Sequence, residues 1–203
     1  MADIFDLPFD DESFDHVFVC FVLEHLADPL GALRALRRVL KTGGAITVIE
    51  GDHGSTFFHP DSVAARGVVR CQVELQARSG GNANIGRSLY PLLDAAGFVD
   101  VSVSPRMVYV DGSRPHLIDG FTRNTFTAMI EGIRTEAIAA DLVAPDAFDA
   151  GVLGDTQGVD GRRRNRTPCL PDSATCADQR NAAAEQPWGG PEYAPAVTTG
   201  HRV

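Results

Sequence analysis

The sequence contains no long apolar run and no excess of positive charge. No stretch approaches the roughly 20 consecutive apolar residues that span a bilayer, so we expect no membrane span. Lysine and arginine number 18 against 27 aspartates and glutamates, giving a net charge of −9. Proteins that bind nucleic acids generally need clustered positive charge to displace counterions from phosphates, so we expect no nucleic-acid partner. The start, Met-Ala-Asp-Ile-Phe-Asp, lacks the basic and apolar regions of a signal peptide, and we expect a cytoplasmic protein.

Cysteine is also sparse and scattered. The four cysteines are Cys20, Cys71, Cys169 and Cys176, and their spacing matches no metal-binding pattern. We therefore predict free thiols in a reducing compartment and no metal site.

The first half of the chain shows a strand, a helix and a second strand joined by short connections. Phe14 to Val22 is a mostly continuous apolar run, which indicates a strand buried on both faces. Asp28-Pro29 is a helix start, and leucines recur at helical spacing until Gly43-Gly44. Ala45 to Ile49 is the next strand. The pattern predicts a right-handed βαβ unit of a doubly wound α/β sheet, with ligands beyond the carboxyl ends of its strands.

The remaining elements are less regular and stop near residue 150. We predict helices over 61–76, 86–96 and 116–140, and a strand over 98–110 that can break at Pro105. From residue 151 the composition shifts to Arg, Pro, Gly, Ala and Thr without apolar periodicity. We therefore predict a domain over residues 1–150 and a disordered or non-native tail over 151–203.

Three blocks, in matching order and spacing, resemble the class I S-adenosylmethionine-dependent methyltransferases. Asp3 to Val17 is similar to the segment D-A-x-x-L-P-F-x-D-x-S-F-D-x-V of that family. Leu23-Glu24-His25 is similar to its L-E-H element, and Arg38 to Gly44 to its R-V-L-K-P-G-G helix end, with Thr42 in place of proline. A weaker likeness to ubiquinone- and menaquinone-type C-methyltransferases continues over residues 84–98. The resemblance implies a partial doubly wound sheet, S-adenosylmethionine as cofactor and a small-molecule acceptor.

The resemblance also implies roles for five residues. Asp3 would accept a hydrogen bond from the adenine amine, and Ile4 would pack against the adenine ring. Cys20 would lie near the methionine part of the cofactor, while Glu24 and His25 would open the loop that faces the site.

The sequence identifies no catalytic residue, because a positioned sulfonium needs a base only when the acceptor carries a proton of high pKa. The candidate bases near the expected strand ends and lid are His53, His59, Tyr90, Tyr109 and His116.

Three parts that the family normally has are not found in the sequence. The glycine-rich turn and the acidic residue that binds the ribose would both precede Asp3, and no late apolar strand follows residue 150. We hypothesise a truncated product with a changed reading frame near its end, whose methyl transfer is impaired. The alternative is a non-catalytic methyltransferase-like remnant or interaction module. Without a neighbour, the strand at Phe14 to Val22 would form an exposed edge of the sheet.

Overall fold

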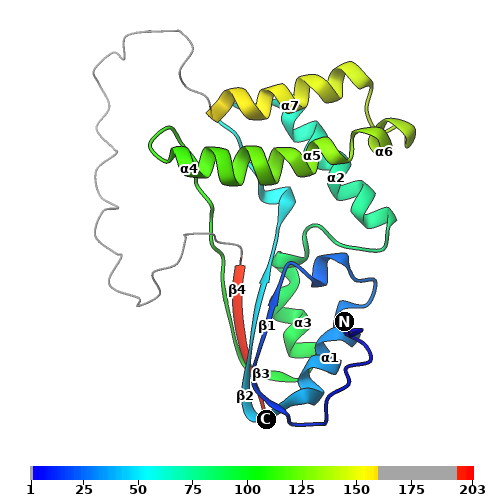
Figure 1. Cartoon of the computed structure of the whole chain (residues 1–203), viewed down its shortest axis with the longest axis vertical. Coiled ribbons are helices and arrows are strands. Elements are labelled where there is room, and N and C mark those ends of the chain that lie inside the picture. Colours follow the sequence, from blue (N-terminus) through cyan, green and yellow to red (C-terminus); the bar gives the residue numbers. More distant parts are fainter. Residues whose placement is uncertain (1, 160–195) are drawn as a thin grey trace.

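The computed structural model describes residues 2–159 and 196–203, and its centre is a four-stranded sheet (Figure 1). The strands are β1 (Phe14–Cys20), β2 (Leu40–Glu50), β3 (Phe98–Ser104) and β4 (Ala196–Arg202). Their order in the sheet is β1-β2-β4-β3. β1 runs parallel to β2, and β4 runs antiparallel to both β2 and β3. The predicted α/β class and the βαβ unit are confirmed.

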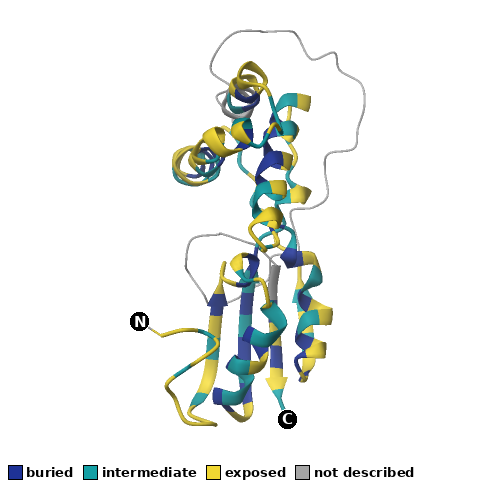
Figure 2. Cartoon of the chain, turned by 90° about the vertical axis from the view of Figure 1, so that its right-hand side faces the viewer, coloured by how far each residue is buried: buried dark blue, intermediate teal, exposed yellow. Residues whose placement is uncertain are grey.

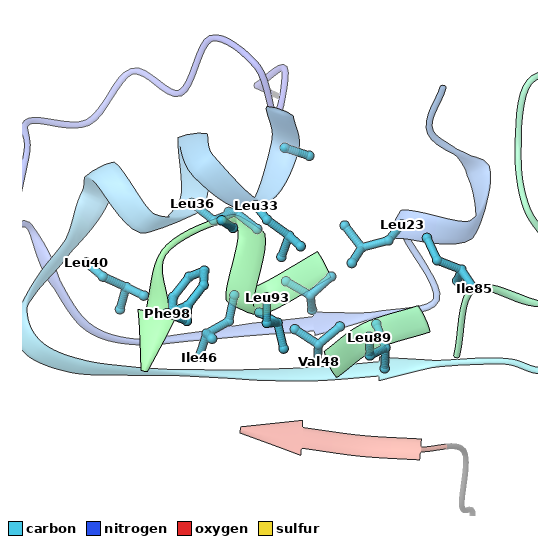
Figure 3. Close-up of a cluster of buried hydrophobic side chains, with 13 residues drawn as sticks. Leu23, Leu33, Leu36, Leu40, Ile46, Val48, Ile85, Leu89, Leu93 and Phe98 are labelled. Atoms are coloured by element: carbon cyan, nitrogen blue, oxygen red, sulfur yellow. The ribbon is translucent and has the colours of Figure 1, made fainter. Parts of the chain in front are cut away.

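Two helices, α1 (Pro29–Val39) and α3 (Leu89–Ala95), pack on the sheet and form its core with it. The side chain of Asp28 caps α1 by accepting the Gly31 N–H at 2.8 Å, and Pro29 takes the first helical position as predicted. Leu33 and Leu36 of α1 point toward β2 in Figure 3. The buried core also contains Val19, Leu23, Leu40, Ile46, Val48, Ile85, Leu89, Leu93 and Phe98.

The other helices gather beyond the end of the sheet at which β1 and β2 terminate (Figure 1). They are α2 (Val63–Arg78), α4 (Pro115–Leu117), the π-helix η4 (Ile118–Thr127), α5 (Ala128–Gly132), α6 (Arg134–Ala139) and α7 (Pro145–Val159). Their own hydrophobic core consists of Val68, Val69, Cys71, Ile130, Ala137 and Phe148. Within the described residues, none of the helices combines the length and hydropathy that crossing a membrane would require.

Several predicted boundaries differ from the observed ones. β2 begins at Leu40 and includes Gly43-Gly44, where the predicted helix end would lie; Gly43 has φ 77°, a value that suits glycine. β3 ends at Ser104, so Pro105 marks the end of a single strand rather than a break within one. The predicted helix over 116–140 is divided into α4, η4, α5 and α6.

The prediction of a structureless region from residue 151 is wrong for two described segments. α7 continues through residues 150 and 151 to Val159, and β4 is a central strand of the sheet. β4 escaped detection because Thr198 and Gly200, the buried residues among 198–202, are small and weakly apolar. A Cβ atom at Gly200 would lie 3.1 Å from the Cβ of Phe98, so the close packing there favours glycine. Residues 160–195 lie outside the described part, and the prediction for them stays a prediction.

β1 is an edge strand within the described part of the chain, since it pairs with β2 alone. Burial on both faces was expected for this strand, but the structure shows it on one face only. Val19 packs in the core with residues of the helices and is buried, whereas Phe18 is 60% exposed and Cys20 is also exposed. Figure 2 shows that buried and exposed positions both occur along the strands of the sheet. The helices α1 and α3 cover a single face, which is why alternate residues of an apolar run remain in contact with water.

A buried carboxylate at the end of β2 holds the chain that leaves β1. Glu50 is fully buried, and its Oε1 accepts the N–H groups of Val22 and Leu23 at 3.0 and 2.8 Å. Its Oε2 accepts the N–H of Glu24 at 3.3 Å. These bonds fix the 3₁₀ turn η1 (Leu23–His25). Burial raises the pKa of Glu50, the three backbone donors oppose that shift, and the nearby Glu24 carboxylate adds to it.

We predict that Arg202→Ala lowers the unfolding free energy by about 2–3 kcal/mol, measured by urea denaturation. Its Nη1 donates to the carbonyls of Arg37 and Arg38 at 3.2 and 3.1 Å and to that of Leu40, which closes the end of α1. The exposed Arg106→Ala is the matched control and should change stability by less than about 0.5 kcal/mol. Equal effects of the two substitutions would contradict this role for β4.

We predict that two substitutions of Glu50 differ strongly in their effect on the unfolding free energy. Glu50→Ala leaves three backbone donors without an acceptor and should cost at least about 2 kcal/mol. Glu50→Gln keeps an oxygen for Val22 and Leu23 and should fold at neutral pH.

We predict that the unfolding free energy depends on pH differently in Glu50→Gln and in the unmodified protein. The folded protein holds the Glu50 proton more tightly than the unfolded chain. The unfolding free energy therefore falls as pH rises from the ordinary value of 4.5 through the raised folded pKa. Glu50→Gln should lack this part of the decline, and an unchanged pH profile would contradict the assignment.

Candidate functional site

The candidate site lies beyond the carboxyl ends of β1 and β2, where three loops meet. The loop after α2 is bound to both strand ends: Asn82 N–H donates to the Glu24 carbonyl at 2.7 Å, and Gly86 N–H donates to the Gly51 carbonyl at 2.9 Å. A Cβ atom at Gly81 would lie 2.4 Å from the Glu24 carbonyl oxygen, so only glycine fits that approach. The walls of the site are thus joined by main-chain bonds.

Glu24 occupies the middle of this site. Its side chain is only 8% exposed, and its two oxygens face two different imidazoles. Oε1 lies 3.3 Å from Nε2 of His25, and Oε2 lies 3.5 Å from Nε2 of His53. Within residues 2–159 and 196–203, Oε2 receives no hydrogen bond. A buried carboxylate oxygen without a donor is costly, so this atom is ready to receive one.

Cys20 ends β1 beside the two carboxylates. Loss of water around its sulfur, followed by the charges of Glu50 and Glu24, raises the pKa of the Cys20 thiol. The thiol therefore stays protonated at neutral pH and is a poor nucleophile. The next residue, Phe21, has φ 52°, an unfavourable value for a bulky side chain, and its N–H is held by the Ile49 carbonyl at 2.8 Å.

A pocket of about 410 Å³ opens between the β2–α2 connection and α2. His53 contributes to its wall and is itself largely buried, with 16% of its side chain exposed. The imidazole is stacked on the ring of Phe126 from η4, with ring centroids 6.4 Å apart and an angle of 17°. The remaining wall consists of Gly54, Thr56, Phe58, Arg66, Val69, Arg70, Val73, Glu74 and Asn84. The pocket is therefore mainly apolar with two guanidinium groups at its side.

Polar contacts hold the loop that carries His53. Its N–H donates to the Ala83 carbonyl at 3.0 Å, and the following Gly54 N–H donates to Asn84 Oδ1 at 2.8 Å. Asp52 binds Arg87 through both carboxylate oxygens, with the shortest contact at 2.6 Å. This loop is thus fixed on both sides of the imidazole.

The structure brings three of the five predicted cofactor residues together. Cys20, Glu24 and His25 lie at the end of β1, as expected from the strand order. Asp3 is exposed, and in the described part of the chain it bonds within its own turn, to Phe5 N–H at 2.9 Å. Ile4 is half-buried and packs against the sheet core. No ligand tests these five assignments, and they stay predictions.

Among the five candidate bases, His53 differs from the others. Tyr90 and Tyr109 are 55% and 53% exposed, and His59 and His116 are exposed as well. Only His53 of this group combines burial, a carboxylate neighbour and a pocket. Sequence reasoning could not select it, because Phe126 and Glu24 are distant in the chain and no motif links them.

Sequence reasoning also missed the part that Glu50 plays. Its position at a strand end was visible, but an acidic residue there is usually solvated, and its burial depends on the turn at Leu23. In the described ranges, no three His, Cys, Asp or Glu side chains gather in a way that would hold a metal ion.

Comparison with known proteins finds sequence similarity mainly in the first part of the chain. Residues 1–48 match the family described as a methyltransferase domain. An uncharacterized 37.1 kDa protein in transposon TN4556 of Streptomyces fradiae is 37% identical over 134 residues, which are 65% of this chain and 38% of that protein. A demethylmenaquinone methyltransferase of Staphylococcus epidermidis is 48% identical over 49 residues, which are 24% of this chain and 20% of that enzyme.

The solved structures are more distant. An S-adenosylmethionine-dependent methyltransferase of Thermotoga maritima aligns with a TM-score of 0.41 and 24% identity, over 53% of this chain and 49% of that one. This chain thus spans less than half the length of the proteins it matches in sequence. The family match covers β1, α1 and most of β2, the unit that carries Glu24 and His25. Residues 1–48 thus resemble a methyltransferase domain in sequence, and in the described part of the chain they belong to a mixed α/β sheet.

Proposed function

We propose that this chain serves S-adenosylmethionine-dependent methyl transfer to a small-molecule acceptor. The observation that carries the proposal is that the pocket lies next to the segment that matches methyltransferases in sequence. The segment that matches methyltransferases ends in β2, and the pocket of about 410 Å³ opens directly beyond that strand, at His53. Pockets of this size, mainly apolar with a few polar groups, suit small organic molecules.

The residues present fit the adenine side of the cofactor. Asp3 uses Oδ1 for Phe5 N–H, and its carboxylate retains lone pairs for the adenine amine. Ile4 is half-buried on the core and offers an apolar surface for a ring. Glu24 Oε2 is a buried acceptor without a donor, which suits a polar N–H or O–H of a ligand at the end of β1.

The bound cofactor would supply an activated methyl group, so the side chains mainly position the acceptor and exclude water. Phe58, Val69 and Val73 provide apolar contact, and Arg70 provides positive charge at the same wall. Acceptors with an acidic group or a developing negative charge fit this lining better than cations. A small molecule also suits the dimensions of the pocket, whereas the acidic chain disfavours a nucleic acid.

An interaction module without catalysis is a second candidate, and the exposed edge β1 favours it. Phe18 and Phe21 are 60% and 47% exposed there, and unpaired strand edges bind other chains readily. Cofactor binding separates the two candidates.

We predict that isothermal titration calorimetry detects binding of S-adenosylmethionine and its demethylated product. Asp3→Ala should weaken binding about tenfold, the loss expected for one hydrogen bond to a charged acceptor. Asp10→Ala, an exposed carboxylate on the same segment, is the matched control and should bind like the unmodified protein. Absence of binding by the unmodified protein at millimolar ligand would reject the methyltransferase proposal and leave the interaction module.

A further inference from the structure

Glu24, one of the five predicted cofactor residues, also forms a carboxylate–imidazole pair with His53. The two residues come from the ends of different strands, and their facing atoms, Oε2 and Nε2, are 3.5 Å apart. This contact is slightly longer than a hydrogen bond, as such pairs often are before a ligand binds. The Glu24 carboxylate is 8% exposed, so its field acts on the imidazole with little screening by water.

Three hydrogen bonds hold the main chain of Glu24. Its N–H is bound by Glu50 at 3.3 Å, and its carbonyl accepts the Asn82 N–H at 2.7 Å and the Gln76 Nε2 at 2.9 Å. A carboxylate on a main chain fixed in this way can orient a neighbouring imidazole. With Nε2 directed at Glu24, the other ring nitrogen, Nδ1, is the atom left to take up a proton.

The position of His53 is determined by the helical part of the molecule. Phe126 stacks on the imidazole from the last turn of the π-helix η4, a helix type frequent at functional sites. His53 also forms part of the wall of the 410 Å³ pocket. It therefore lies next to a buried carboxylate and borders a space of a size that suits a small organic molecule.

The other charged groups around His53 have partners of their own. Asp52 binds Arg87, Glu74 binds Arg78 at 2.9 Å, and Arg66 binds Asp61. The Glu50 carboxylate accepts hydrogen bonds from backbone N–H groups, and His25 lies next to Oε1 of Glu24, the oxygen that does not face His53. Arg70 also lines the pocket and adds positive charge there. Glu24 is therefore the carboxylate placed to act on His53.

We propose that His53, oriented by Glu24, accepts a proton from an aromatic hydroxyl compound bound in this pocket. As a part of methyl transfer, this inference rests on the proposed function. The O–H bond of the acceptor breaks, its proton moves to the imidazole, and the negative charge faces Arg70. The electron pair thus freed on the acceptor forms the new bond to the methyl carbon, while the carbon–sulfur bond of S-adenosylmethionine breaks and its electrons pass to sulfur.

The test uses 4-nitrophenol as probe, because its phenolate absorbs visible light and its ionisation needs no cofactor. The full chain is titrated with the probe at a pH close to the pKa of the probe, where free imidazole is mainly neutral and can accept a proton. The ratio of phenolate to phenol should be about fivefold higher for the bound probe than for the free probe, since nearby positive charge favours the ionised form. Equilibrium dialysis measures how much probe is bound.

Three variants test the two members of the pair. His53→Gln and His53→Phe should abolish the increase in phenolate, and the phenyl ring preserves the stack on Phe126 if the amide destabilises the fold. Glu24→Gln should remove most of the increase. Probe affinity should stay within about threefold in all three, because the apolar wall is unchanged. His16→Gln, an exposed histidine near the start of β1, is the matched control and should behave as the unmodified protein.

The outcomes that overturn the proposal are distinct. The first is failure of 4-nitrophenol to bind. The second is an increase in bound phenolate that persists in both His53 variants. The third is an increase that is lost in His25→Gln but kept in the His53 variants. Calorimetry with S-adenosylmethionine, carried out on the same samples, separates this proposal from the proposed function. Ionisation that depends on His53, without cofactor binding, would reject methyl transfer and retain the proton-accepting pair.

Discussion

The bonds from the Glu50 carboxylate to the backbone of residues 22–24 connect the fold with the candidate site. A fully buried acid is unfavourable unless hydrogen bonds compensate it, and here three main-chain donors do so. The same bonds set the path of the turn that begins at Leu23, whose side chain enters the sheet core. They also set the place of Glu24, one residue further on. Packing and chemistry at this strand end therefore depend on one side chain.

The site also depends on a connection between the two hydrophobic cores. The sheet core holds β1, β2, α1 and α3, and the helical core is centred on α2, α5, α6 and α7. His53 belongs to a connection between them, and its stacking on Phe126 joins the sheet side to the helical side. The pocket occupies this junction, so small movements of the helices would change the surroundings of the imidazole.

Local signals were sufficient to predict the βαβ unit, and insufficient for features that require distant residues. The apolar run from Phe14, the Asp28-Pro29 helix start and the leucine spacing are all read from adjacent residues, and they predicted β1, α1 and β2. β4 was missed because its sequence, Ala-Val-Thr-Thr-Gly-His-Arg, has no apolar alternation, and its neighbours come from far along the chain. The Glu24–His53 pair was missed for the same reason, since burial of the carboxylate arises only after the strands align.

The insertion of β4 between β2 and β3 has a consequence for the order of folding. β2 ends at Glu50 and β3 at Ser104, whereas the strand that joins them begins at Ala196. During synthesis the ribosome therefore releases both flanking strands long before their common neighbour exists. Until then each presents an unpaired edge that other nascent chains or chaperones can bind, and the sheet closes through contacts of high sequence separation, which form slowly.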